Sequence, residues 1–114
     1  MEINEAVTAE IVKIAAPKLF GRGKIVVGRD ARLSSPALYK AVKKSLVIGH
    51  KSSVIIDGGL MTTPMLYFLV HQLKAAGGIM VTASHNPKEY NGLKFVGREA
   101  KAISGTEIKR LVMK

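Results

Sequence analysis

Residues 24–49 read KIVVGRDARLSSPALYKAVKKSLVIG, and this stretch decides the fold. It begins with a short β-branched run at 24–28, which is typical of a buried strand. Ser34 or Ser35 can cap a following helix, with a proline in its first turn and Gly49 at its end. The stretch therefore predicts a strand followed directly by a helix.

The same order continues along the chain. SSVIID at 52–57 predicts a second strand, TTPMLYFLVHQLKAAG at 62–77 a helix that stops at a glycine, and GGIMVTA at 77–83 a third strand. Strands that alternate with helices predict a parallel sheet whose two faces are covered.

Both flanks of this unit add elements. A helix is expected over 8–20, with Thr8 as its N-cap and with Pro17 able to end or kink it early. GLKFVG at 92–97 predicts a fourth strand, which must run antiparallel because the loop before it is too short for a parallel crossover. A last helix is expected over 104–114, capped by Ser104 or Thr106.

Together these elements predict one α/β domain over residues 1–114. The expected architecture has three layers, α/β/α, around a mixed sheet of three parallel strands and one antiparallel strand. A chain of 114 residues with 47% apolar residues can bury a core of its own.

Composition narrows the classes of partner. The chain has 18 Lys and Arg against 8 Asp and Glu, a formal net charge of +10, which suits an anionic partner. Nucleic acid is not favoured, because Trp is absent and only three Phe and three Tyr could stack on bases. No apolar run reaches a membrane span of about 20 residues, so no membrane is expected. The lack of cysteine agrees with the cytoplasm, where we expect the protein.

Three polar segments follow the three parallel strands. They read GRDARLSS at 28–35, DGGLMTTP at 57–64 and TASHNPKEYNG at 82–92. Loops at the carboxyl ends of parallel strands lie at one edge of the sheet and carry its functional residues. We therefore expect all three segments to meet there.

The third segment has a restricted backbone and unusual polar content. Pro87 restricts Asn86 to extended conformations, and Asn91-Gly92 tolerates positive φ. A loop shaped in this way can hold the Ser84 hydroxyl outward.

Cations surround that hydroxyl in the sequence. Lys88 and Lys94 supply positive charge, and His85 can transfer a proton. Serine among cations suits phosphoryl chemistry, in which positioning and charge neutralisation do most of the catalysis. A merely polar surface loop remains the alternative at this point.

Other sites are less well supported by the sequence. A nucleotide-binding glycine fingerprint, a P-loop and a complete metal site are not evident. A Ser-His-Asp triad would combine Ser84 with one of three histidines and one of two aspartates: His50, His71, His85, Asp30 and Asp57. Neighbouring side chains in extended chain point apart, which disfavours the pair Ser84–His85, and packing is the better interpretation of His50 and His71.

TASHNPKEYNGLKF at 82–95 resembles the phosphoserine loop of the α-D-phosphohexomutases, the phosphoglucomutase/phosphomannomutase superfamily. VVGRDARLSSP is similar to that family's V-G-x-D-x-R-x-S-S segment, and DGGLMTTPMLYF to its D-x-G-x-x-x-T-P segment. The order and spacing agree over residues 5–112, so the chain is similar to the first, N-terminal domain of the family.

The resemblance implies a role for each matching residue. Ser84 would carry the phosphoryl group, with His85 and Lys94 beside it as proton-transfer and electrostatic groups. The sugar phosphate would be bound by four further loop residues: Asn86, Lys88, Asn91 and Gly92. Support at the edge of the site would come from Arg29, Asp30 and Arg32.

The implied reaction moves a phosphoryl group between the 1- and 6-positions of a hexose phosphate, with a hexose 1,6-bisphosphate as activator. The phosphate on Ser84 would give one oxygen to Mg²⁺, which the family binds mainly through its second domain. Because the remaining family loops belong to other domains, we expect no turnover by this chain alone. We expect the missing domains, or self-association through an apolar patch or a sheet edge near the fourth strand, to cover its exposed face. The alternative is a non-catalytic module that keeps the fold and binds a phosphosugar or a protein.

Overall fold

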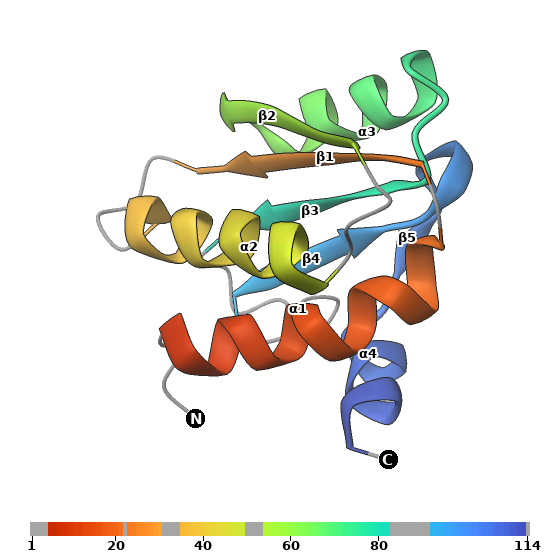
Figure 1. Ribbon diagram of the computed structural model, residues 1–114. Helices are drawn as coiled ribbons and strands as arrows, with labels where there is room; N and C mark the ends of the chain where they lie inside the picture. Colours follow the sequence, from red (N-terminus) through yellow and green to blue (C-terminus); the bar gives the residue numbers. More distant parts are fainter. Residues whose placement is uncertain (1–4, 22, 31–34, 50–53, 83–91, 114) are drawn as a thin grey trace.

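The computed structural model describes residues 5–21, 23–30, 35–49, 54–82 and 92–113 (Figure 1). Its helices are α1 (Glu5–Phe20), α2 (Ser35–Gly49), α3 (Thr63–Gln72) and α4 (Gly105–Val112). Its strands are β1 (Lys24–Arg29), β2 (Val54–Leu60), β3 (Gly77–Val81), β4 (Leu93–Val96) and β5 (Ala102–Ile103), with a short 3₁₀ turn, η1 (Arg98–Ala100), before β5. No helix within these ranges has the length and apolar character that a membrane span requires.

The described strands form one mixed sheet in the order β2-β1-β3-β4-β5. β1 pairs in parallel with both β2 and β3, and β4 pairs antiparallel with β3, as the sequence predicts. The expectation of four strands is wrong, because β5 pairs antiparallel with β4 through Phe95 and Ile103. The edge expected near the fourth strand is therefore occupied by β5, and β2 is an edge strand of this sheet.

Alternating strand residues contribute to two separate clusters of buried side chains. Ile25 and Val27 of β1 pack with residues of α1, α2 and α4, whereas Val26 packs with Leu66 and Val70 of α3. Figure 1 shows α1 and α2 on one side of the sheet and α3 on the other. The period of two along β1 thus assigns each side chain to its cluster.

Glycine at the start of β3 permits close packing in the core. A Cβ atom on Gly77 would lie 2.3 Å from a ring carbon of Phe20 and 2.4 Å from the Val96 carbonyl oxygen. Phe20 in turn stacks on Phe95, with 6.3 Å between ring centres. This contact fixes the end of α1 against the sheet.

Several predicted helix ends differ from the structure. α1 begins at Glu5, so Thr8 lies inside its first turn with a buried hydroxyl and is not its N-cap. Pro17 neither ends α1 early nor prevents it from reaching Phe20. Of the two caps offered for α4, Ser104 is the one used, since its hydroxyl accepts the Glu107 N–H.

α3 also ends earlier than predicted. It stops at Gln72 because Lys74 adopts a left-handed φ of 51°, the conformation usually supplied by glycine at this place. The Ala75 N–H then donates to the Val70 carbonyl, and the Ala76 N–H donates to the Lys24 carbonyl of β1. The chain is thus already joined to the sheet before Gly77, where the helix was predicted to end.

Candidate active site at the carboxyl edge of the sheet

The carboxyl ends of the three parallel strands lie side by side. Arg29 of β1 is in register with Leu60 of β2 and with Val81 of β3. The next residues extend this pairing, since the Asp30 N–H donates to the Val81 carbonyl at 3.0 Å and the Met61 N–H to the Arg29 carbonyl at 2.9 Å. The predicted convergence of the three polar segments is confirmed for the residues described at their starts.

β2 runs three residues further than predicted, into the glycines of DGG. The β1–β2 register shifts between Val27 and Gly28, so that Gly28 pairs with Gly59. Met61 lies across this irregularity: a Cβ on Gly28 would be 2.6 Å from its side chain, and one on Gly58 would be 2.0 Å away. The two glycines therefore make room for Met61 at the edge of the site.

A tyrosine of α2 stabilises the same irregularity of the β1–β2 pairing by hydrogen bonds. The Tyr39 hydroxyl accepts the Gly59 N–H at 2.8 Å, and its proton is shared between the Asp57 carboxylate and the Val27 carbonyl oxygen. Lys43 Nζ binds the other Asp57 oxygen at 2.8 Å and lies 4.8 Å from the centre of the Tyr39 ring.

The titration of this cluster follows from its contacts. Burial, followed by the hydrogen bond to Asp57, raises the pKa of Tyr39 to about 12. Hydrogen bonds from Lys43 and then from Tyr39 hold the pKa of Asp57 below its usual value. Asp57 is thus an ionised structural group bound to α2, which gives no support to its use in a catalytic triad.

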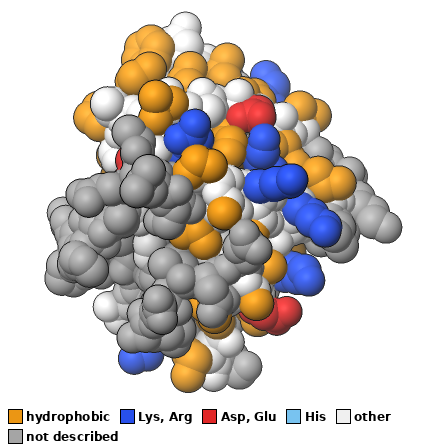
Figure 2. Space-filling model, turned by 90° about the vertical axis from the view of Figure 1, so that its left-hand side faces the viewer, with side chains coloured by type: hydrophobic (Ala, Val, Ile, Leu, Met, Phe, Trp, Pro, Cys, Tyr) orange, Lys and Arg blue, Asp and Glu red, His pale blue; other side chains and the backbone are white. Residues whose placement is uncertain are grey.

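A hollow of about 460 Å³ opens at this edge, beside the start of α3. Its lining residues share an apolar or hydroxyl character, apart from one carboxylate: Leu60, Met61, Thr62, Thr63, Met65, Met80 and Asp30. Thr62 caps α3, because its hydroxyl accepts the Met65 N–H at 3.3 Å. Figure 2 views this edge and shows apolar side chains gathered at its top and Lys and Arg side chains along one side.

The third polar segment leaves and rejoins the sheet at one point. The Thr82 N–H donates to the Gly92 carbonyl at 2.7 Å, and Gly92 has a φ of 79°, which glycine adopts without strain. The segment between them, with the predicted residues Ser84, His85, Asn86, Lys88 and Asn91, lies outside the described residues, as does Arg32.

Lys94 lies two residues beyond this closure, on β4 opposite Met80. Its Nζ atom lies 5.3 Å from the centre of the Tyr67 ring of α3, within the range of a cation–π interaction. The ring can therefore hold the ammonium group on the α3 side of the sheet.

The two supporting residues that are described are the last residue of β1, Arg29, and the residue after it, Asp30. One Arg29 guanidinium nitrogen donates to the Asp30 carbonyl at 3.2 Å, and both side chains are partly buried. Asp30 also lines the hollow, so its position allows contact with a ligand bound there, in addition to the structural role expected for it.

Tyr39 and Tyr67 were missed by reasoning from the sequence. Tyr39 follows Leu38 on the buried face of α2, and its spacing indicates only core packing. The contact of Tyr39 with Gly59 had no local signal, because the two residues lie 20 positions apart on different elements. The contact between Tyr67 and Lys94 joins α3 to β4, and no pattern within either segment of the sequence predicts it.

Sequence and structure comparisons agree on the family. Residues 1–113 match the family described as "Phosphoglucomutase/phosphomannomutase, alpha/beta/alpha domain I". The chain is 46% identical over 103 residues to "Phosphohexose mutases" of Xanthomonas campestris pv. campestris (strain B100), covering 90% of the chain and 22% of that protein. It is 43% identical over 104 residues to a "Phosphomannomutase" of Klebsiella pneumoniae, covering 91% of the chain and 64% of that protein.

The fold has a solved counterpart. A putative phosphomannomutase from Thermus thermophilus matches with a TM-score of 0.77 and 35% sequence identity, over 96% of this chain and 26% of that one. The chain thus spans about a fifth of the length of the Xanthomonas relative and about a quarter of the Thermus structure. The chain belongs to the phosphoglucomutase/phosphomannomutase family and corresponds to its domain I.

Proposed function

We propose that the chain forms one domain over residues 1–114 and carries the phosphoserine of a phosphohexomutase at Ser84. The observation that supports this most is the closure of the 83–91 segment by the Thr82–Gly92 hydrogen bond of 2.7 Å. It fixes both ends of the segment at the carboxyl edge of the sheet, where ligands bind in open α/β folds. Lys94 follows the closure and brings a cation to the same edge.

The proposed step is a phosphoryl transfer to the Ser84 hydroxyl. Ser84 Oγ attacks the phosphorus of a hexose 1,6-bisphosphate, the bond from phosphorus to one sugar oxygen breaks, and that oxygen leaves. Overall the serine proton passes to the leaving sugar oxygen, and His85 is the proton-transfer group beside the transferred phosphoryl group. In the reverse direction, the phosphoryl group passes to the 1- or 6-oxygen of a hexose monophosphate.

Charge neutralisation is the main task of the surrounding groups. Lys94 offsets the charge on the transferred phosphoryl group, and the Tyr67 ring holds its ammonium without neutralising it. The sugar phosphate is bound by four further residues of the segment: Asn86, Lys88, Asn91 and Gly92. Arg29 and Asp30 support the edge from β1, with Arg32 beyond them in the sequence.

The Mg²⁺ that the family implies does not find a complete site in the described residues. Within these ranges no three His, Cys, Asp or Glu side chains gather closely enough to hold a metal ion. A phosphate on Ser84 would add one oxygen ligand, and the remaining ligands must come from elsewhere in the enzyme. When bound there, Mg²⁺ would supply charge stabilisation to the phosphoryl group.

We propose that the chain alone has no appreciable mutase turnover. It spans 22% of the Xanthomonas relative, and its described residues lack a metal cluster. An exposed apolar face of Leu60, Met65 and Phe68 beside the hollow suits cover by the further domains or by a second copy. A strictly monomeric chain by light scattering at high concentration would exclude the second copy.

The experiment is a single-turnover labelling of the purified chain. Incubation with glucose 1,6-bisphosphate, Mg²⁺ and the remaining domains of a phosphohexomutase, supplied as a separate chain, should add one phosphoryl group, located on Ser84 by peptide mass spectrometry. Ser84→Ala should abolish the label, and Thr106→Ala, which removes an exposed hydroxyl of α4, should leave it unchanged. An unlabelled chain would contradict the proposal, as would steady conversion of glucose 1-phosphate by the chain alone.

The alternative function is a non-catalytic module that binds a phosphosugar or a protein. The apolar face and the hollow of about 460 Å³ are the observations that favour it. It predicts that glucose 6-phosphate binds the chain equally well before and after Ser84→Ala, with no phosphoryl group on Ser84. Loss of binding on that substitution would count against it.

A further inference from the structure

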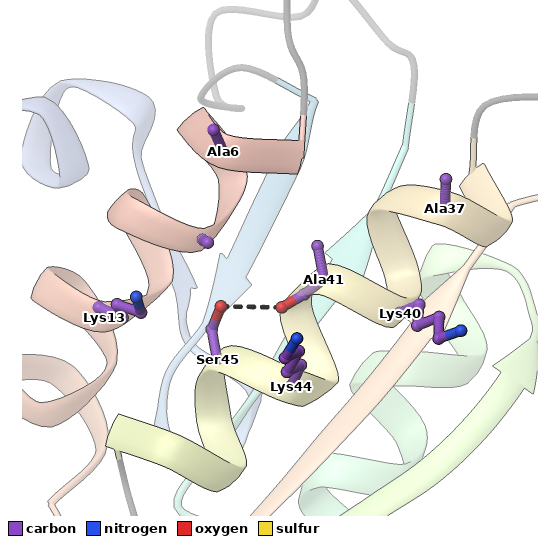
Figure 3. A pocket seen from close by; sticks show the side chains of 8 residues that line it. Ala6, Lys13, Ala37, Lys40, Ala41, Lys44 and Ser45 are labelled. Carbon is purple, nitrogen blue, oxygen red and sulfur yellow. Dashed lines mark hydrogen bonds between the residues drawn. The ribbon is translucent and has the colours of Figure 1, made fainter.

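A groove separates α1 and α2 on the outer side of these helices, across the sheet from α3. Its volume is about 480 Å³, and every lining residue belongs to one of the two helices (Figure 3). Arg29, Asp30 and Lys94 do not line it. The groove is therefore a separate feature from the hollow beside α3.

The walls of the groove carry small side chains. α1 contributes Ala6 and Ala9, and α2 contributes Ala37 and Ala41. The Ser45 hydroxyl, also in the wall, donates to the Ala41 carbonyl at 2.8 Å and so belongs to its own helix. Methyl-lined walls of this kind allow the backbone of another helix to approach closely.

Three lysines border these walls. Lys13 lies on α1, and Lys40 and Lys44 lie on α2. All three side chains are exposed, and Figure 3 shows Lys13 extending from α1 towards α2. Within the described residues none of the three is paired with a carboxylate, whereas Lys43, one position away, is paired with Asp57 on β2.

We propose that this groove docks an acidic amphipathic helix of a partner protein. The small residues of α1 and α2 receive the apolar stripe of that helix, and the three lysines meet Glu or Asp side chains at i, i+4 spacing along it. The net charge of +10 draws such a partner to the chain before contact. This docking goes beyond the phosphoryl transfer and does not depend on it.

The chemistry of the walls favours a helix over a small anion. The lining side chains include no arginine, and lysine ammonium groups on flexible stems hold a small anion without fixed geometry. They also include no aromatic ring on which a nucleic-acid base could stack. A helix gains from the apolar walls as well as from the charges, which neither of the other ligands does.

The test uses the full chain and two synthetic peptides of equal length. One is a fluorescein-labelled helical peptide of Glu, Ala and Gln with Glu at i, i+4 spacing, and the other has Lys in place of Glu. Fluorescence anisotropy should show binding of the acidic peptide alone, with an affinity that falls as salt is raised.

Two variants then locate the contact. Replacing the three groove lysines, Lys13, Lys40 and Lys44, with Gln should weaken binding about tenfold, as three partly screened charge pairs would. A matched control carries the same charge change at exposed lysines of other elements: Lys74, Lys101 and Lys109. It should bind within about twofold of the wild type, because screening weakens distant charges.

A third variant separates shape from charge. Ala41→Leu fills the groove without altering any charge and should also weaken binding, while the circular-dichroism spectrum stays unchanged. Equal losses in the two triple variants would overturn the proposal in favour of general charge attraction. The proposal would also be overturned if Ala41→Leu bound the acidic peptide as tightly as the wild type does. The same holds if the wild-type chain bound duplex DNA more tightly than the peptide through these three lysines. Labelling of Ser84 should be normal in every variant, so the result is independent of the proposed transfer.

Discussion

Replacing Tyr39 with phenylalanine removes one hydroxyl and keeps the ring in the core between α2 and the sheet. In the wild type that hydroxyl accepts the Gly59 N–H at 2.8 Å and shares its proton between the Asp57 carboxylate and the Val27 carbonyl oxygen. The substitution therefore leaves the bend after Asp57 without its only described side-chain acceptor.

The expected cost follows from these contacts. A hydrogen bond to a charged group contributes about 1.5–3 kcal/mol, and the lower end applies because the Asp57 side chain is 53% exposed and therefore screened. Leaving the Gly59 N–H unpaired adds up to about 1 kcal/mol at this partly buried position. We expect the free energy of unfolding at pH 7 to fall by about 2 kcal/mol.

Urea denaturation followed by circular dichroism measures this difference, and its pH dependence tests the cause. The folded-state pKa of Tyr39 is raised to about 12, so its contribution is complete below about pH 10 and is lost as pH rises towards 12. The folded-state pKa of Asp57 is lowered, so its contribution is present above its unfolded value of about 4 and is lost as pH falls further. The difference between wild type and variant should be flat from about pH 5 to pH 9 and shrink on both sides.

Tyr67→Phe provides the matched control. The Tyr67 hydroxyl makes no hydrogen bond to the residues that the structure describes, so this variant should lose less than about 0.5 kcal/mol. Equal losses in the two variants, or a difference that does not change with pH, would refute the role assigned to the Tyr39 cluster.

Three further predictions concern single contacts. Gly77→Ala should lower the free energy of unfolding by about 3 kcal/mol, measured by urea denaturation, because its Cβ would lie 2.3 Å from the Phe20 ring. Thr8→Val should leave stability unchanged or raise it by about 1 kcal/mol in the same assay, since the Thr8 hydroxyl is buried without a partner among the described residues. Tyr67→Leu should abolish the ring-current shift of the Lys94 ε-protons in the NMR spectrum, and Tyr67→Phe should keep it.

Most of the fold was predictable because its signals are local. The strand runs at 25–28 and 77–81 are continuous and buried, and the antiparallel direction of β4 follows from the length of the loop before it. β5 was missed because a strand of two residues shows no periodicity in the sequence. It is recognised only by its pairing with β4, which is a tertiary contact. The early end of α3 was missed because Lys74 adopts the left-handed conformation that a glycine usually supplies.

The candidate site, too, was predictable only where its signals are local in the sequence. The three polar segments were recognisable from composition and order, and the edge at which they meet follows from the parallel pairing of β1 with β2 and β3. The groups that hold them were not recognisable, because Tyr39 reaches Gly59 from another element and Tyr67 reaches Lys94 in the same way. The sequence predicted that the strand ends at Asp57, whereas Gly58 and Gly59 continue β2 through a register shift.

The high positive charge has more than one use in the structure. Lys43 binds Asp57, and Lys18 and Lys24 donate to the backbone carbonyls of Leu111 and Leu73. These contacts join α2 to β2, α1 to α4 and β1 to the end of α3. These three lysines therefore make contacts within the fold.

Lys94 and the three groove lysines are the described cations that we assign to ligands, and they lie apart on different elements. The net charge of +10 therefore overstates the positive charge that is gathered at any single anion-binding site. Substitutions separate the two sets: glucose 6-phosphate binding and its salt dependence should fall when Lys94 is replaced with Gln and stay unchanged in the groove triple variant, and acidic-peptide binding should show the reverse. A single substitution that weakened both equally would show that the charge acts as one diffuse field, and the two sites would then have to be treated as one.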